Sequence, residues 1–514
     1  MKKSKKSVLA LAGLVVAMSS ATAQTFTGAF DVGPGGNPQK FNPLTASAGF
    51  SFYNKYFSTL TLYDVGLQKI SGDLAESWNY STDAKSLAIK LRKGVKWHDG
   101  TPLTARDVKF TLELVRHPDM ASVFAARLEA ISSIKVSDDQ NLVLTLSSPD
   151  VSLPDALTAV MILPQHLLGQ VAPKDLRNGD WWKSPVGSGP FKWVKYVPDQ
   201  YVELAANPDF YRGKPKLAKL INRYFKDGSS AAIALQAGEI QHTPLTLDQV
   251  RENEKTKAYN VVAGSSHVLN YIGFNNDDPR FKDVRVRQAI MLALDRSAIV
   301  KNLYAGNATL ASCALTLPKF LPGQLEPYAT DLARARQLLS DARWSSLSRG
   351  EPIEMLTYYG DQVSKDVLAA VQSMLAQVGV KISPRFVDGA TYGQLTDSGK
   401  FAMVFAGQGN GPDPSVYNNV LGSAYVPPKG LNRMRISNPE IDKLLEAGKA
   451  EVNEGKRTQI YQQLCRATNE QLPLVPLWVA NRFGGFGKNV QDALWTPAPG
   501  GGRYQDHPEN WSLR

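Results

Sequence analysis

Apolar and polar residues alternate along several short stretches of the chain, and this pattern predicts β-strands. Leu87, Ile89 and Leu91 alternate with small or charged residues, which is the period of a strand buried on one face. The same reasoning predicts strand pairs at 134–136 with 142–146 and at 191–194 with 201–204. The turn residues between the members of each pair indicate antiparallel hairpins.

Other stretches place apolar residues three and four positions apart, as amphipathic helices do. Thr104 is a good helix N-cap with Asp107 three residues later, and Val108, Leu112 and Val115 then share one helical face. Further helices are predicted at 365–378, at 438–445, at about 453–470 and from Asp283 to a point before Gly306. Helices and strands therefore alternate through much of the chain, which predicts a mixed α/β protein.

The N-terminus carries a composition of its own. Four lysines precede an apolar run from Val8 to Met18, and small residues follow up to Ala23. This is the order of a secretory signal peptide. The apolar run is too short for a transmembrane anchor, which needs about 20 residues. We expect cleavage after Ala23, so that Gln24 begins a mature chain long enough for at least two hydrophobic cores.

Removing the four leader lysines lowers the net charge from +11 to about +7. The remaining Lys and Arg residues form no dense block, and export argues against a nucleic-acid partner. We expect a soluble monomer outside the cytoplasm. Cys313 and Cys465 are the only cysteines. Export permits a disulfide between them, but spacing alone does not bring them together, and we favour two separate buried thiols.

The sequence lacks the usual signatures of catalysis and metal binding. None of the six histidines forms an H-x-H or H-E-x-x-H pair, and no C-x-x-C occurs. A G-x-S-x-G elbow, a Walker loop and a dinucleotide fingerprint are also missing. We therefore predict no catalytic residues, no metal site and no cofactor. An exported hydrolase remains an alternative that turnover of a substrate would revive.

In four stretches the identity of the residues is more informative than the hydrophobic periodicity. They are LRKGVKWHDGTPLTARDVKFTLE at 91–113, SPVGSGPFKW at 184–193, AAIALQAGEI at 231–240 and DVRVRQAIMLALDRSAIVKNLYAG at 283–306. These segments resemble those of the family-5 extracellular solute-binding proteins, the peptide/nickel-binding class of ABC importers. The resemblance covers nearly all of the mature chain in the family's order.

The resemblance implies a two-lobed periplasmic-binding-protein-like α/β fold with a hinge and an extra subdomain in the first lobe. We expect lobe one to contain 24–265 and 480–514, with the subdomain at about 44–170, and lobe two to contain 266–479. Two chain crossings, near 265–270 and 478–482, would form the hinge. The implied function is capture of a peptide in the interlobe cleft and delivery to an ABC permease. An oligosaccharide, an opine or a metal chelate is the alternative solute, and binding of a partner protein is a further alternative.

The loop after the predicted strand at 403–405 is the candidate ligand site, because the family places ligand contacts in it. It offers Gln408, Gly409, Asn410 and Asp413. Peptide-binding members often hold the ligand's α-ammonium with an aspartate here, but the corresponding residue is Asn410, which cannot pair a charge. Asp413 either supplies the anion or only stabilises its own turn. Aromatic walls are expected from Tyr53, Tyr358, Tyr417 and Trp495, although such residues are more often packing residues than ligand contacts.

The leader pattern predicts a mature N-terminus at Gln24. N-terminal sequencing of the protein recovered outside the cytoplasm should return a chain that begins QTFTG. A recovered chain that still begins at Met1, or one that stays in the membrane fraction, would contradict this prediction.

Overall fold

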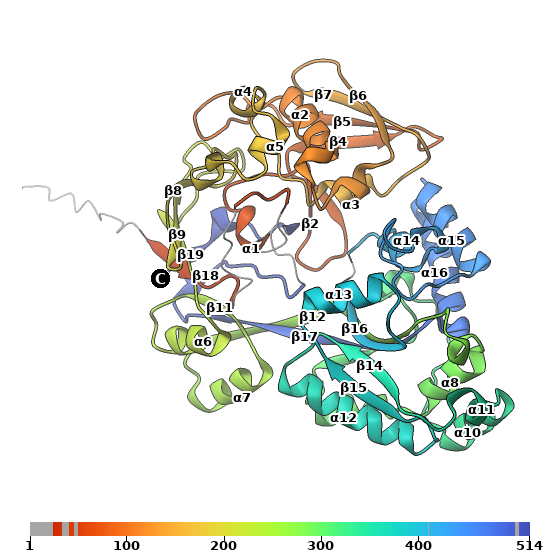
Figure 1. Ribbon diagram of the computed structural model, residues 1–514. Helices are drawn as coiled ribbons and strands as arrows, with labels where there is room; N and C mark the ends of the chain where they lie inside the picture. The colour runs from red at the N-terminus through yellow and green to blue at the C-terminus, as the bar shows by residue number, and fades with distance from the viewer. Residues whose placement is uncertain (1–23, 33–40, 46–49, 410, 499–502) are drawn as a thin grey trace, which may run out of the picture.

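Two long strands hold the molecule together. The computed structural model describes residues 24–32, 41–45, 50–409, 411–498 and 503–514. In it, β12 (Asn260–Phe274) and β17 (Leu474–Phe486) pair in antiparallel fashion and cross the molecule from one lobe to the other (Figure 1). At one end β17 pairs with a strand of lobe one, and at the other end β12 pairs with a strand of lobe two. A single sheet therefore runs through both lobes.

Lobe one is built on one half of this sheet. Its strands lie in the order β17-β11-β1-β10-β9-β8, and β1 pairs in parallel with both β10 and β11. Helix α6 packs against β11 and β17. The strands and helices are β1 (Thr25–Gly28), β8 (Phe191–Val197), β9 (Tyr201–Ala206), β10 (Lys219–Arg223), β11 (His242–Leu245), α6 (Gly228–Gln236), α7 (Leu247–Thr256), β18 (Val490–Gln491) and β19 (Ser512–Leu513).

A separate four-stranded antiparallel sheet, in the order β4-β5-β7-β6, forms the subdomain of lobe one. In β5 the residues Leu87, Ile89 and Leu91 are buried and their neighbours are not, which confirms the predicted strand. Helix α2 begins after Thr104, whose side chain and that of Asp107 form the predicted capping box. The elements are β4 (Ala75–Tyr80), β5 (Ser86–Leu91), β6 (Ile131–Val136), β7 (Asn141–Leu146), α2 (Ala105–Arg116), α3 (Leu153–Leu157), α4 (Gln165–Leu168) and α5 (Pro173–Leu176).

Short elements join the subdomain to the rest of lobe one. Strands β2 and β3 form a two-stranded sheet, the 3₁₀ turns η2 and η3 lie within the subdomain, and η4 follows it in the chain. Their bounds are α1 (Phe50–Tyr53), β2 (Thr61–Tyr63), β3 (Ile70–Gly72), η2 (Pro118–Met120), η3 (Ala125–Leu128) and η4 (Asp180–Lys183); η9 (Pro508–Asn510) lies near the C-terminus.

Lobe two continues the shared sheet in the order β12-β16-β14-β15, with β14 parallel to both neighbours. The single helix predicted from Asp283 is two helices, α8 and α9, because Ala293 ends the first and the Asp295 side chain caps the second. The elements are β13 (Ala308–Leu310), β14 (Ile353–Thr357), β15 (Ile382–Phe386), β16 (Met403–Gly409), α8 (Val284–Leu292), α9 (Arg296–Asn302), α10 (Leu332–Asp341), α11 (Trp344–Ser348), α12 (Gln362–Ala376), α13 (Gly389–Asp397), η5 (Pro279–Phe281) and η6 (Pro318–Phe320).

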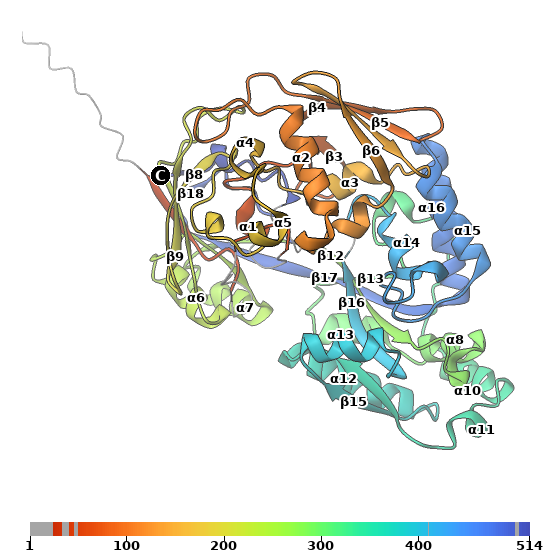
Figure 2. The same ribbon diagram turned by 45° about the horizontal axis from the view of Figure 1, so that its top comes forward.

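A group of C-terminal helices of lobe two lies beside the subdomain in both ribbon views (Figures 1 and 2). It contains α14 (Val416–Leu421), η7 (Ser423–Tyr425), α15 (Pro439–Ala450) and α16 (Glu454–Gln471). Asn438 caps α15 with Pro439 in its first turn, as the sequence predicts. Within the described residues, no helix is long and apolar enough to cross a membrane.

The expectation of two separate thiols is wrong. Cys313 and Cys465 form a disulfide, with Cα atoms 5.3 Å apart. The chain after β13 runs alongside α16, and this tertiary contact between residues 152 apart has no counterpart in the sequence pattern.

The β12–β17 pairing breaks register between Ser265 and Leu269, opposite Asn481 and Val479. This irregular segment coincides with the chain crossings expected from the sequence. We therefore propose that the lobes divide as predicted, at 265/266 and 479/480, with the subdomain at about 44–170. The Ser265–Leu269 segment would act as the hinge, since unpaired backbone bends more easily than a continuous ladder.

The disulfide closes a long loop and should add substantially to stability. Replacing both cysteines with alanine should lower the free energy of unfolding by about 2–5 kcal/mol. Chemical denaturation of the oxidised wild type, the reduced wild type and the double variant provides the measurement. Equal midpoints for all three forms would show that the crosslink contributes nothing.

Candidate functional site

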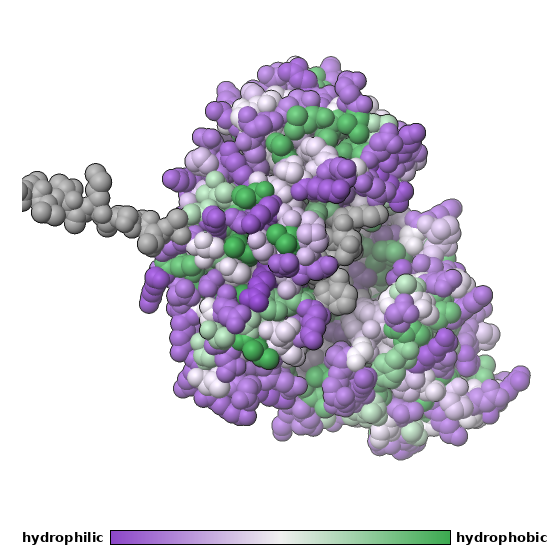
Figure 3. All heavy atoms as spheres, turned by 60° about the vertical axis from the view of Figure 1, so that its left-hand side comes forward, coloured by the Kyte–Doolittle hydropathy of each residue, from purple (hydrophilic) through white to green (hydrophobic). Residues whose placement is uncertain are grey.

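The boundary between the lobes encloses a cavity beside the hinge. Its volume is about 600 Å³, and its lining comes from the β2–β3 turn of lobe one, from β12 and β17, and from the segment of lobe two that follows β13. Gln68, Ser265, His267 and Leu315 are among the lining residues. Figure 3 shows the surface hollowed between the two lobes. Because both lobes line this cavity, its shape depends on how far apart the lobes lie, and opening the lobes would separate its walls.

The strand directions bring loops from both lobes to this boundary. Parallel strands β1 and β10 end in lobe one, before Asp31 and Tyr224, and parallel strands β14 and β16 end in lobe two, before Tyr358 and at Gly409. In open α/β sheets the crevice outside the carboxyl ends of parallel strands is where ligands bind. Each lobe thus presents its carboxyl-end loops as candidate binding surface.

Arg482 on β17 lies next to the hinge cavity. It pairs with Gly264 across the strands, and its Nη1 donates a hydrogen bond to the Pro497 carbonyl oxygen at 3.2 Å. Gly264 and Pro497 both line the cavity. The Arg482 side chain is exposed, yet the surrounding protein lowers its pKa. A side chain at the wall of a crevice is exposed to solvent on one side and surrounded by protein on the others, and the lost hydration disfavours its charged form.

Asp413, one of the two candidate anions of the loop, is already paired. Its carboxylate accepts two hydrogen bonds from Arg457, at 2.7 and 2.9 Å, and one from the backbone N–H of Ser415 at 2.8 Å. Burial alone would raise the pKa of Asp413, but Arg457 outweighs it and the pKa is lowered. Little of either side chain is exposed, and both line a pocket of about 350 Å³ to which the two lobes contribute. The carboxylate stabilises its own turn and holds α16, and its charge is neutralised without a ligand.

The other polar residues of the loop lie where β16 ends. Gln408 pairs with Leu269 and Gly409 with Val268, next to the irregular segment of β12. Gly409 is exposed and Gln408 is half-buried, with its Nε2 donating to the Gly409 carbonyl oxygen at 2.9 Å. Asn410 lies outside the described residues.

The four aromatic candidates occupy different environments. Tyr417 is buried and its hydroxyl donates to the Ala314 carbonyl oxygen inside lobe two. Tyr53 is buried on α1, with its ring edge-on to Tyr56 at 6.1 Å. Trp495 covers Gly484, where a Cβ atom would come within 2.9 Å of its ring. Tyr358 is half-buried against Tyr392, at 4.8 Å between ring centroids. Tyr358 and Trp495 are the two that retain exposed surface.

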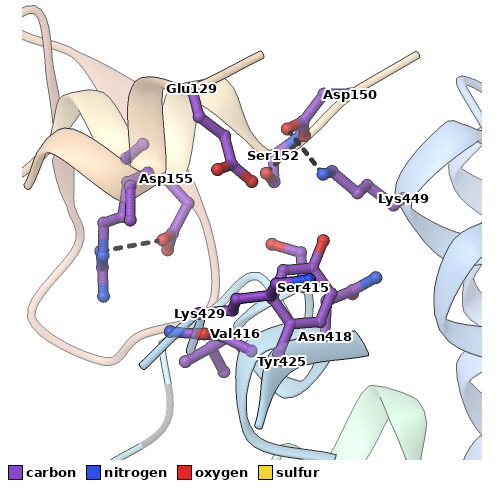
Figure 4. A pocket seen from close by; sticks show the side chains of 14 residues that line it. Glu129, Asp150, Ser152, Asp155, Ser415, Val416, Asn418, Tyr425, Lys429 and Lys449 are labelled. Carbon is purple, nitrogen blue, oxygen red and sulfur yellow. Dashed lines mark hydrogen bonds and ion pairs between the residues drawn. The ribbon is translucent and has the colours of Figure 1, made fainter. Parts of the chain in front are cut away.

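A direct contact joins the subdomain to α15 across the lobe boundary. The backbone N–H of Val151 donates to the Lys449 carbonyl oxygen at 2.9 Å, and the Lys449 ammonium lies 3.4 Å from the Asp150 carboxylate. Both side chains of this ion pair are largely buried. Figure 4 shows the pair at the rim of a small pocket of about 110 Å³ lined by both lobes. These contacts hold the lobes together on the side far from the sheet.

Sequence reasoning missed three polar residues of the boundary. Asp31, His267 and Arg482 belong to no motif. His267 and Arg482 lie on the paired strands β12 and β17, and Asp31 follows β1, so only the fold places them. His267 has a positive φ of 52° and lines the hinge cavity, and its Nδ1 has no partner within the described residues. Among those residues, no cluster of three or more His, Cys, Asp or Glu side chains could hold a metal ion.

Comparison with known proteins identifies the family. The chain belongs to the bacterial extracellular solute-binding proteins of family 5, whose middle-region model matches residues 69–426. A relative from Brucella melitensis, provisionally named an ABC transporter peptide-binding protein, is 46% identical over 97% of this chain and 96% of its own length. The family consists of solute-binding receptors of ABC transporters, and this chain is one of them.

Two solved structures show the same two-lobed fold. The oligopeptide-binding protein AppA from Bacillus subtilis, in complex with a nonapeptide, matches with a TM-score of 0.79 and 27% identity over 96% of this chain and 99% of its own. NikZ from Campylobacter jejuni, in complex with Ni(L-His), matches with a TM-score of 0.80 and 25% identity over 95% and 99%. The fold expected from the sequence is confirmed.

The Asp413–Arg457 pair leads to a prediction about stability. Asp413→Asn leaves the Arg457 guanidinium buried without its counter-charge and should lower the free energy of unfolding by about 3–5 kcal/mol. Denaturant titration measures this, with Asp248→Asn, an exposed helix position, as the matched control. An Asp413→Asn variant as stable as the control but unable to bind solute would instead place this carboxylate on the ligand.

Proposed function

We propose that the protein captures a peptide in the cleft between its lobes and delivers it to an ABC permease. The observation that carries this proposal is the cavity of about 600 Å³ beside the hinge, which both lobes line. Its volume falls within the ~300–1,000 Å³ typical of ligand pockets. The walls combine apolar side chains with a few polar groups, the composition that binds and orients a small solute.

Capture rests on contacts that form only when both lobes are present. A solute that touches both lobes binds the closed form more tightly than the open one and shifts the population toward closure. The contacts of Lys449 with Asp150 and Val151 belong to the closed form, since they bridge the lobes. They add to the stability of the closed form and hence to the apparent affinity for solute. No covalent chemistry enters this proposal.

Peptide is the proposed solute because AppA was solved with a nonapeptide and the Brucella relative is named for peptides. Gln408, Gly409, Asn410 and Tyr358 are the proposed contacts from lobe two, at the carboxyl ends of β14 and β16. Gln408, Gly409 and Tyr358 do not line the hinge cavity, so the proposed site extends beyond it along the lobe boundary. Their backbone and amide groups suit the backbone of an extended peptide. Trp495 is the proposed aromatic wall from lobe one.

A metal–amino-acid chelate is the second candidate. NikZ was solved with Ni(L-His), and His267 presents an unpartnered Nδ1 to the hinge cavity. A chelate that brings most of its own ligands needs only one such group from the protein. Tight binding of Ni(L-His) together with rejection of peptides would favour this candidate.

The place of action follows from the leader sequence. We propose export through a signal peptide that is cleaved after Ala23, and function as a monomer in the periplasm beside the permease. The surface that docks on the permease would be presented by both lobes in the closed form, so that the permease recognises loaded receptor.

Native mass spectrometry of protein purified from its source under mild conditions should show a retained peptide. Isothermal titration calorimetry with that peptide then gives the affinity. Retention of a sugar, an opine or a metal complex in place of peptide would overturn the choice of solute and leave the receptor function intact. A protein that retains no solute and hydrolyses the offered peptides would overturn the receptor function itself.

The contacts across the lobe boundary predict a variant with weakened binding that does not touch the solute. Lys449→Met leaves the buried Asp150 carboxylate unpaired in the closed form and should weaken solute binding by about 5–30-fold, or ~1–2 kcal/mol. Calorimetry with the retained peptide measures the loss. Lys443→Met, an exposed position on the same helix, is the control and should bind as wild type. Equal affinities would remove Lys449 from the closing contact.

A further inference from the structure

The half-buried Asp31 of lobe one forms no ion pair among the described residues. Asp31 follows β1 at the carboxyl end of the parallel strands, and its Oδ1 accepts a hydrogen bond from the Ser51 hydroxyl at 2.8 Å. Its Oδ2 is inaccessible to solvent and has no hydrogen-bond partner within the described residues. An unpaired buried carboxylate oxygen costs stability, so a fold keeps one only where something else compensates for it.

The two nearest cations do not neutralise Asp31. Lys55 is buried and forms its ion pair with Asp506. Arg482 attracts Asp31 electrostatically but forms no ion pair with it, and its Nη1 is bonded to the Pro497 carbonyl oxygen. Burial raises the pKa of Asp31, and Ser51, Arg482 and Lys55 only partly oppose the rise. A further positive charge would therefore stabilise the ionised form of Asp31.

Two tyrosine side chains, those of Tyr53 and Tyr224, lie near the Asp31 carboxylate. Burial raises the pKa of Tyr53 and of Tyr224, and the Asp31 carboxylate adds to both shifts, so the two rings lie within reach of its charge. Aromatic rings beside a carboxylate favour cations, because the faces of the rings are also negative. Arg482 attracts the same carboxylate and is hydrogen-bonded to Pro497, which lines the hinge cavity.

We propose that Asp31 binds an ammonium group of the captured solute, and so supplies from lobe one the anionic anchor that the loop of lobe two lacks. This inference rests on the proposed function. The contrast with Asp413 carries it: Arg457 saturates the Asp413 carboxylate, whereas Oδ2 of Asp31 is inaccessible to solvent and has no hydrogen-bond partner in the part of the chain that the structure describes. The ammonium would come from the peptide N-terminus or from a lysine side chain.

Three synthetic peptide pools separate these sources. All contain random peptides of about two to nine residues that lack Arg, His, Asp and Glu. The first pool has free N-termini and no lysine, the second is N-acetylated without lysine, and the third is N-acetylated with one lysine per peptide. Each pool is offered to the full mature protein, and native mass spectrometry measures how much of it is retained.

The wild type should retain the first or the third pool at least tenfold better than the second. Asp31→Asn keeps the shape and the hydrogen bond with Ser51 but loses the charge, and it should lose that preference at least tenfold. Ser51→Ala, which keeps the carboxylate, should retain it, as should Asp248→Asn at an exposed site of the same lobe. Which pool is preferred identifies the source of the ammonium.

Stability separates binding from a structural role. An aspartate retained to support the fold would lower Tm when replaced, whereas relief of an unpaired buried charge should leave the Tm of ligand-free Asp31→Asn unchanged or higher. Equal retention of the acetylated lysine-free pool by wild type, or unchanged retention by Asp31→Asn, would overturn the role of Asp31 and leave peptide capture standing. A wild type that retains none of the three pools would overturn peptide capture and this role together.

Discussion

The pairing of β12 with β17 is the constraint on which the rest of the structure depends. Both strands belong to both lobes, so every contact of one lobe with the other is set by how these two strands twist and bend. Their ladder is broken between Ser265 and Leu269 and shifts register again between Asn270 and Tyr271. Gly264 and Gly484 leave room on one face of the strands for Pro497 and Trp495 to lie close to the backbone. The hinge cavity is lined from the same place, by Gly264, Ser265 and Pro497.

Asp413 in lobe two and Asp31 in lobe one differ in whether a cation neutralises their charge. In lobe two the buried Asp413 and Arg457 neutralise one another, which fixes the loop after β16 against α16. In lobe one Asp31 is left without such a partner, and Arg482 stands nearby without closing on it. The first arrangement gives rigidity and the second leaves charge available for a solute. The Asp150–Lys449 pair spans the two lobes.

Local pattern was enough to predict much of the fold. The alternation in β5, the capping box of α2 and the N-cap of α15 all depend on residues a few positions apart, and each is confirmed. The four segments that resemble family-5 proteins predicted the family, and comparison with known proteins confirms it. The signal peptide stays a prediction, since residues 1–23 lie outside the described part of the chain.

Long-range contacts account for what the sequence did not predict. The disulfide joins residues 152 apart, and Arg457, the partner of Asp413 in the loop after β16, lies 44 residues further on in α16. Asp31 and Arg482 carry no motif, because their environment is created by strands from opposite ends of the chain. Periodicity reports which face of an element is buried, but it does not report which buried charge has been left without a partner.

Closure about the irregular segment of β12 is the central claim, and a distance across the lobe boundary tests it most directly. Spin labels on Lys135→Cys in the subdomain and Lys443→Cys on α15 would be specific, because Cys313 and Cys465 are bonded to each other. Pulsed electron paramagnetic resonance should show a short, narrow distance distribution with saturating solute and a longer, broader one without it. The same distribution in both states would contradict the account.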